Sequence, residues 1–154
     1  MTAHVLMLSS SREGDEAYLT HAKARILAHL GDIRDLVFIP YAAVTQSYDS
    51  YVDAVASALP ECNVVGLHTF DDPVAAIHNA SENGHAIVVG GGNTFHLLHS
   101  LYRFALMVPL KHAICNGVPY VGWSAGSNIC GQSIRTTNDM PIIEPPSFDA
   151  LEVV

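Results

Sequence analysis

Positive charge is scarce in this sequence. Its 154 residues include only 7 lysines and arginines, against 15 aspartates and glutamates, so the formal net charge is −8. Proteins that bind the nucleic-acid backbone need clustered lysine and arginine, and here the few basic residues are scattered along the chain. The composition therefore argues against a nucleic-acid-binding protein.

Long apolar runs and cysteine patterns are absent as well. No apolar run reaches the roughly 18 to 20 residues that cross a bilayer, and the start of the chain (residues 1–4) lacks the basic residues of a signal peptide. The three cysteines are Cys62, Cys115 and Cys130, too widely spaced for a zinc pattern or a disulfide framework. We therefore expect a soluble cytoplasmic protein with reduced thiols, no membrane association and no cofactor.

Short apolar runs alternate with amphipathic segments throughout. The expected strands cover residues 5–8, 36–39, 64–67, 86–89 and 119–123, and the expected helices cover 15–30, 47–59, 72–83, 94–106, 109–116 and a segment beginning at 125. Strands that are apolar throughout and separated by helices indicate parallel pairing with helices on both faces. The predicted fold class is α/β: a doubly wound, mostly parallel sheet in a single domain over residues 1–154.

Residues 122–126 read Gly-Trp-Ser-Ala-Gly, which is the spacing of a nucleophile elbow. Such an elbow exposes a serine hydroxyl at a sharp turn between a strand and a helix, and its glycines give the backbone room for the turn. Ser124 is therefore a candidate nucleophile, and the adjacent helix N-terminus favours developing negative charge. The alternative is an ordinary strand–helix turn made of small residues.

A second glycine-rich segment, Gly-Gly-Gly-Asn, follows the strand expected at 86–89. Because sites in open α/β sheets lie at the carboxyl ends of the strands, this segment and the elbow are expected to lie together. The backbone N–H of Ala125 is one candidate oxyanion donor, and the glycine backbone offers another. The candidate residues there are Gly91, Gly92 and Asn93. The alternative is a structural glycine turn, since no phosphate-binding pattern continues after it.

A polar segment at 134–141 follows the elbow closely. Asp139 can orient a histidine or bind a substrate amine, and Arg135 can bind a substrate carboxylate through two hydrogen bonds. The alternative is a loop in which these two residues pair with each other. Among the 9 histidines, His96 and His99 share a helix face. Nothing supplies the further ligands of a metal site, so no metal is expected, and no histidine is marked as a general base.

Three of these blocks, residues 88–95, 122–126 and 134–141, together resemble the signature segments of the peptidase E family. Residues 38–42, 44–46 and 148–151 resemble further family segments, so the resemblance covers essentially the whole chain. It implies a flavodoxin-like fold of the class I glutamine amidotransferase-like superfamily. It also implies a serine peptidase that hydrolyses dipeptides with an N-terminal aspartate. Ser124 would be the nucleophile. Asp139 matches an aspartate described as part of the charge relay, although the family's triad acid has also been assigned to a glutamate farther downstream.

The catalytic histidine of that family lies in an Asn-Pro-His-type segment, which does not occur in these 154 residues. Three explanations stay open at this point: a fragment of a longer peptidase, truncated at its C-terminus; a short homologue that has lost catalysis and serves binding or assembly; or a substitute histidine from this chain or a partner. Another amidotransferase-like acyl hydrolase is a further alternative. An apolar sheet edge left uncovered predicts a homo-oligomer or a marginally stable monomer.

Overall fold

Five parallel strands form the centre of the computed structural model, which describes residues 3–9, 19–135 and 137–154. The strands are β1 (Val5–Leu8), β2 (Asp35–Ile39), β3 (Asn63–Gly66), β4 (Ala86–Val89) and β5 (Tyr120–Trp123). They lie in the order β1-β5-β4-β2-β3, and every pairing is parallel. The inner strands β4 and β5 are buried at every position, as their continuous apolar runs require.

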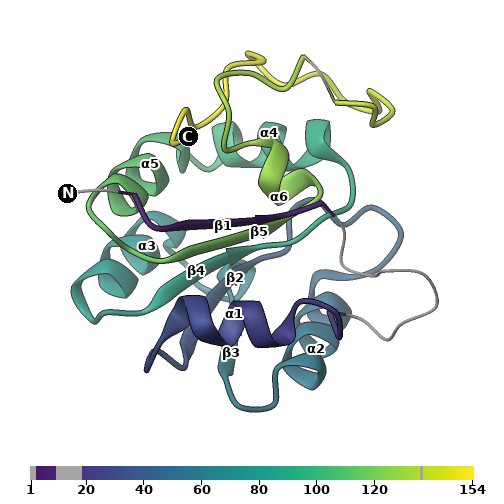
Figure 1. Cartoon of the computed structure of the whole chain (residues 1–154). Coiled ribbons are helices and arrows are strands. Elements are labelled where there is room, and N and C mark those ends of the chain that lie inside the picture. Colours follow the sequence, from purple (N-terminus) through teal and green to yellow (C-terminus); the bar gives the residue numbers. More distant parts are fainter. Residues whose placement is uncertain (1–2, 10–18, 136) are drawn as a thin grey trace.

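Helices cover both faces of this sheet. They are α1 (Lys23–Leu30), α2 (Tyr48–Ala58), α3 (Pro73–Glu82), α4 (Thr94–Arg103), α5 (Met107–Cys115) and α6 (Ala125–Asn128), with a short 3₁₀ turn η1 (Leu67–Thr69). Figure 1 shows α1 and α2 on one face and the other four on the opposite face. Each face has its own apolar core, one around Phe38 and Trp123 and the other around Leu97 and Ile114. The predicted doubly wound α/β class is confirmed.

Two predicted helix boundaries are wrong, and left-handed backbone conformations explain both. The helix expected over 15–30 appears in its described part as a turn at 19–22 followed by α1, and residues 15–18 lie outside the described part. Leu19 has a φ of +60°, which a right-handed helix does not accommodate. Helix α4 ends earlier than expected because Ala105 has a φ of +56°. The longest described helix, α2, has only 11 residues, and no helix in this part of the chain meets the length and apolarity needed to cross a membrane.

The last residues of the described chain run back along the segment that follows α6 (Figure 1). The N–H of Leu151 donates to the carbonyl of Ile129 at 2.8 Å, and the Leu151 side chain is 1% exposed. The end of the chain is therefore partly buried, with Val154 left exposed. Strand β1 forms one edge of the sheet and Met7 on it is half exposed. Self-association through this edge stays a prediction.

Histidine 29 links α1 to the start of β5 and should make the fold sensitive to acid. Its Nε2–H donates to the Tyr120 carbonyl at 3.1 Å, and its ring lies 4.1 Å from that of His4. Burial, and secondarily the neighbouring His4, lower the pKa of His29 below its ordinary value of 6.5. Below about pH 6.5 the imidazole of residue 29 is therefore protonated more readily in the unfolded chain than in the folded one. The free energy of unfolding falls as the pH falls.

We expect the free energy of unfolding to decrease as the pH falls from about 6.5 towards the lowered pKa of His29, and a His29→Gln variant to lose part of that decrease. Urea titrations at a series of pH values measure this. His78→Gln, which changes an exposed histidine on α3, is the control and should keep the wild-type pH profile. Identical pH profiles for His29→Gln and the wild type would contradict the prediction.

Candidate active site

Ser124 lies at the turn between β5 and α6, with φ +54° and ψ −113°. Few residues with a side chain adopt a positive φ, and holding one there costs roughly 1–3 kcal/mol, which the surrounding structure has to offset. Three backbone hydrogen bonds hold the turn: the Ser124 N–H donates to the Leu8 carbonyl at 3.0 Å, and the Ser124 carbonyl accepts from the N–H groups of Ser127 at 3.0 Å and Asn128 at 2.9 Å. The sharp turn predicted from the glycine spacing is present.

Glycines are required around this turn because the backbones pass too closely for side chains. A Cβ added to Gly126 would lie 2.1 Å from the Val89 carbonyl oxygen of β4, and one added to Gly122 would lie 2.5 Å from the Gly126 oxygen. A Cβ on Gly91 would lie 2.7 Å from the Cβ of Ser124. The loop after β4 therefore rests directly against the serine.

Three backbone N–H groups in the elbow and the loop after β4 make no hydrogen bond to the described residues. Within the described residues, the N–H groups of Gly91, Gly92 and Ala125 donate to no acceptor. Gly92 has a φ of +146°, and a Cβ there would lie 2.1 Å from the Ala42 carbonyl oxygen, so the loop is pressed against the chain after β2. Backbone N–H groups without an acceptor in the protein are what an oxyanion site needs, so these three stay candidate donors.

Asn93, also predicted to lie at the site, supports the loop of residues 90–92 that follows β4, here called the glycine loop. Its side-chain oxygen accepts from the His96 N–H at 3.1 Å and so caps α4, while its amide nitrogen donates to the Met140 carbonyl at 2.7 Å. The side chain is nearly buried. In this structure both ends of the amide are therefore engaged within the protein.

The hydroxyl of Ser124 donates to the Ser9 carbonyl at 3.2 Å. None of the 9 histidines of the chain, all of which belong to the described residues, hydrogen-bonds to it. His96, the nearest to the glycine loop in sequence, instead places Nδ1 2.5 Å from the Tyr41 carbonyl oxygen. The structure therefore brings the serine and the N–H groups together without an imidazole.

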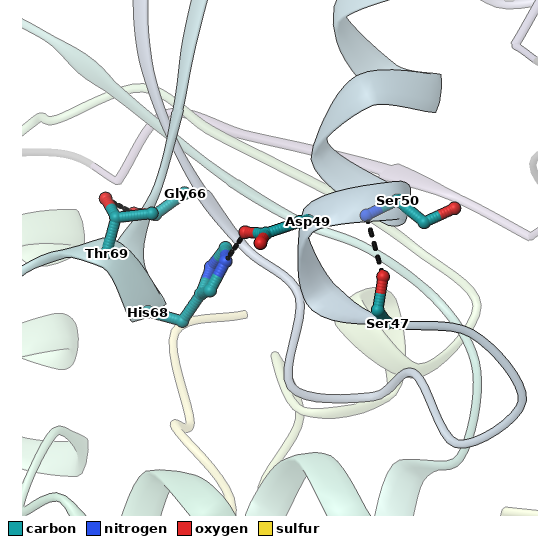
Figure 2. A network of polar contacts seen from close by, with 6 residues as sticks. All are labelled: Ser47, Asp49, Ser50, Gly66, His68 and Thr69. Atoms are coloured by element: carbon teal, nitrogen blue, oxygen red, sulfur yellow. Dashed lines mark hydrogen bonds and ion pairs between the residues drawn. The ribbon is translucent and has the colours of Figure 1, made fainter.

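A histidine–carboxylate pair does exist, but far from the serine. In Figure 2 the His68 ring points from η1 towards the start of α2, where its Nε2 lies 2.6 Å from Asp49 Oδ1. His68 follows β3, which β2 and β4 separate from β5. Three strand spacings amount to about 14 Å, so this pair does not reach Ser124. Its members lie 19 positions apart in the chain, and no local pattern in the sequence could have revealed the pair.

Asp139 and Arg135 occupy different surroundings. The Asp139 carboxylate accepts hydrogen bonds from the N–H and the hydroxyl of Thr94, at 2.8 and 2.5 Å. The Arg135 guanidinium lies over the Phe148 ring, 5.7 Å from its centroid, and forms no ion pair with any described residue. The alternative in which Arg135 pairs with Asp139 is therefore not found.

An open cleft of about 390 Å³ lies between the segment that follows β2 and the first turn of α4. Its lining residues are Ala43, Val44, Gln46, Ser47, Tyr48 and His96. It lies where the chain leaves β2 towards one face of the sheet and leaves β4 towards the other, which is the position at which open α/β sheets bind ligands. Apart from the early loop at 38–46, sequence reasoning did not point to this cleft. No group of three His, Cys, Asp or Glu side chains among residues 3–9, 19–135 and 137–154 could hold a metal ion.

By fold and site, the chain is a parallel α/β protein with a serine at a sharp strand–helix turn that has the glycine spacing of a nucleophile elbow. The model of peptidase family S51 matches residues 5–154, and the chain belongs to that family. It is 52% identical to the Peptidase E of Shewanella sp. (strain W3-18-1) and 49% identical to that of Shewanella oneidensis. Both alignments cover 100% of this chain and 64% of the relative, so the chain spans slightly under two thirds of the length of these relatives.

Solved structures share the fold. A protein from Listeria monocytogenes EGD-e, presented as a candidate peptidase E, has a TM-score of 0.73 at 24% identity, over 100% of this chain and 76% of that one. A peptidase from an acI-B1 actinobacterium has a TM-score of 0.65 at 16% identity, over 99% and 66% of the two chains. At these identities the likeness concerns the fold alone. The resemblance to the peptidase E family inferred from the sequence is confirmed by the family match.

Gly126→Ala should disrupt the elbow, because its methyl group would overlap the Val89 carbonyl. We expect a loss of about 1–3 kcal/mol in the free energy of unfolding, the usual cost of overpacking. Chemical denaturation measures this loss. Gly131→Ala is the matched control, since the nearest atom to its added Cβ would be the Asn128 oxygen at 4.0 Å. A Gly126→Ala variant as stable as Gly131→Ala would show that the elbow tolerates a side chain.

Proposed function

We propose that the chain carries the nucleophile and oxyanion-binding part of a serine peptidase that cleaves dipeptides with an N-terminal aspartate. The observation that carries the proposal is the Ser124 turn, a serine held at φ +54° beside N–H groups with no acceptor in the described part of the chain. Membership of peptidase family S51 and relatives named Peptidase E support it.

The proposed reaction is acyl transfer. The Ser124 oxygen attacks the peptide carbonyl while a base removes the hydroxyl proton. The carbonyl oxygen becomes an oxyanion that accepts hydrogen bonds from Ala125 and from Gly91 or Gly92, and each such donor contributes about 10²–10³-fold to kcat. The peptide C–N bond then breaks as the leaving amine takes up the proton. Water hydrolyses the resulting Ser124 ester and releases aspartate.

The base of this reaction is not among the groups that hydrogen-bond to Ser124 in the structure. That observation favours a second candidate function, a homologue that binds peptides in the same site or assembles with a partner without cleaving. The two functions share the glycine loop and the cleft, and they differ in whether the Ser124 hydroxyl is reactive.

Replacing the serine separates the two candidates. The peptidase function predicts that this chain releases aspartate from Asp-Leu and that Ser124→Ala loses that release by at least about 10³-fold, since the nucleophile is essential to acyl transfer. Alanine keeps the Cβ at the strained turn, so both proteins should have similar stability. Amino-acid analysis measures the product, and a fluorophosphonate probe reports whether Ser124 is labelled. Equal release by both proteins would contradict the peptidase proposal. Tight dipeptide binding in calorimetry without release or labelling would support the binding protein.

Arg135 is the proposed partner of the substrate's aspartate side chain, because its guanidinium has no ion pair within the described residues. We expect Arg135→Gln to raise the KM for Asp-Leu about 10- to 100-fold and to leave Asn-Leu unaffected, because a hydrogen bond to a charged group contributes roughly 1.5–3 kcal/mol. Arg103→Gln is the matched control, since this arginine also lies over a ring, that of Phe104 at 5.3 Å. Equal changes in the two variants would argue against a role for Arg135.

A further inference from the structure

The segment after α6 is attached to the start of α4 through Asp139. One oxygen of the carboxylate, Oδ2, accepts from both the N–H and the hydroxyl of Thr94, at 2.8 and 2.5 Å. One residue later, the Met140 carbonyl accepts from the Asn93 amide at 2.7 Å. Asn93 and Thr94 directly follow the glycine loop. The 139–140 segment therefore holds the end of that loop at three points.

The same group of side chains also reaches the elbow helix. The Asn128 amide on α6 donates to the hydroxyl oxygens of Thr94 at 3.0 Å and of Thr137 at 3.3 Å. The backbone N–H of Asn128 donates to the Ser124 carbonyl at 2.9 Å. A continuous path of hydrogen bonds thus runs from Asp139 through Thr94 and Asn128 to the residue that carries the candidate nucleophile.

The glycine loop and the elbow lie very close to each other. Gly91 packs so closely on Ser124 that an added Cβ would lie 2.7 Å from the serine Cβ. Oxyanion donors act only within about 2.7–3.1 Å of the oxygen that they stabilise. A shift of the glycine loop by a fraction of an ångström would therefore change how its N–H groups meet a reacting carbonyl.

We propose that Asp139 is a positioning residue that joins the glycine loop to the elbow helix and sets the distance between the N–H groups on either side of Ser124. Its consequence for catalysis rests on the proposed peptidase function. In a charge relay Asp139 would instead accept a hydrogen bond from an imidazole, and its second oxygen, Oδ1, has no partner among the described residues. The experiment therefore has to distinguish two roles of Asp139: a joint, which attaches the glycine loop to the elbow helix, and a relay, which accepts a hydrogen bond from an imidazole.

The structural part is tested without any enzymatic activity. We expect Asp139→Ala and Thr94→Val in this chain to shift and broaden the amide NMR signals of Gly91 and Gly92. The loop loses its attachment in these variants and exchanges between positions on the microsecond-to-millisecond timescale. Asp139→Asn keeps an oxygen that can accept both Thr94 hydrogen bonds, so those signals should stay close to wild type. Thr69→Val is the matched control, since it removes a threonine hydrogen bond to Gly66 at the far strand (Figure 2). Unchanged glycine signals in Asp139→Ala would overturn the proposal.

The kinetic part separates the joint from the relay. Changing a triad aspartate to asparagine costs about 10⁴-fold in kcat, so a relay predicts that Asp139→Asn is as damaged as Asp139→Ala and that Thr94→Val is spared. The joint predicts that Asp139→Asn stays within about tenfold of wild type, with an unchanged pH profile. It also predicts that Asp139→Ala and Thr94→Val each lose about 10²–10³-fold, the scale of one oxyanion donor, and that the double variant loses little more. A wild-type chain without activity would count against the peptidase function only, because the NMR comparison would still decide the joint.

Discussion

The close approach of the backbones of β4, β5 and α6 at the centre of the sheet is the constraint on which the site depends. Strand β4 and helix α6 come so near each other that residue 126 has no room for a Cβ beside the Val89 oxygen. That contact fixes α6 against the sheet, and α6 in turn fixes the strained turn at Ser124. The glycine loop after β4 then reaches the serine from the neighbouring strand, so the candidate nucleophile and its N–H groups share one rigid support.

The sheet could be predicted from the sequence because its inner strands are apolar on both faces. Strands β1 and β4 occupy the predicted residues 5–8 and 86–89, and no end of the other three strands differs from its prediction by more than one residue. The errors arise where residues other than glycine adopt a positive φ. Leu19 and Ala105 both end or delay a helix in this way, and neither leucine nor alanine marks such a position in a sequence. Tertiary contacts impose these conformations, and local propensity does not reveal them.

The candidate site was predictable only to the extent that it is local. The turn at Ser124 and the glycine loop each occupy a few consecutive residues, and parallel pairing of β4 with β5 brings them together. The partner of Asp139 was not predictable, because Thr94 lies 45 residues away in the chain. The cleft beside His96 was missed for the same reason, since its walls come from the segments after two different strands. Contacts between segments far apart in the chain produce no characteristic residue spacing, so a sequence pattern does not reveal them.

The shortness of α6 has a consequence for the order in which the molecule forms. Four residues make too few hydrogen bonds to hold a helix by themselves. The antiparallel return of residues 148–153 holds the segment directly after α6, where the Leu151 N–H donates to the Ile129 carbonyl. During synthesis this return leaves the ribosome about 25 residues after the elbow, and domains fold as their segments emerge. The sheet and the serine turn can therefore assemble on a nascent chain while the segment that follows α6 still lacks this return.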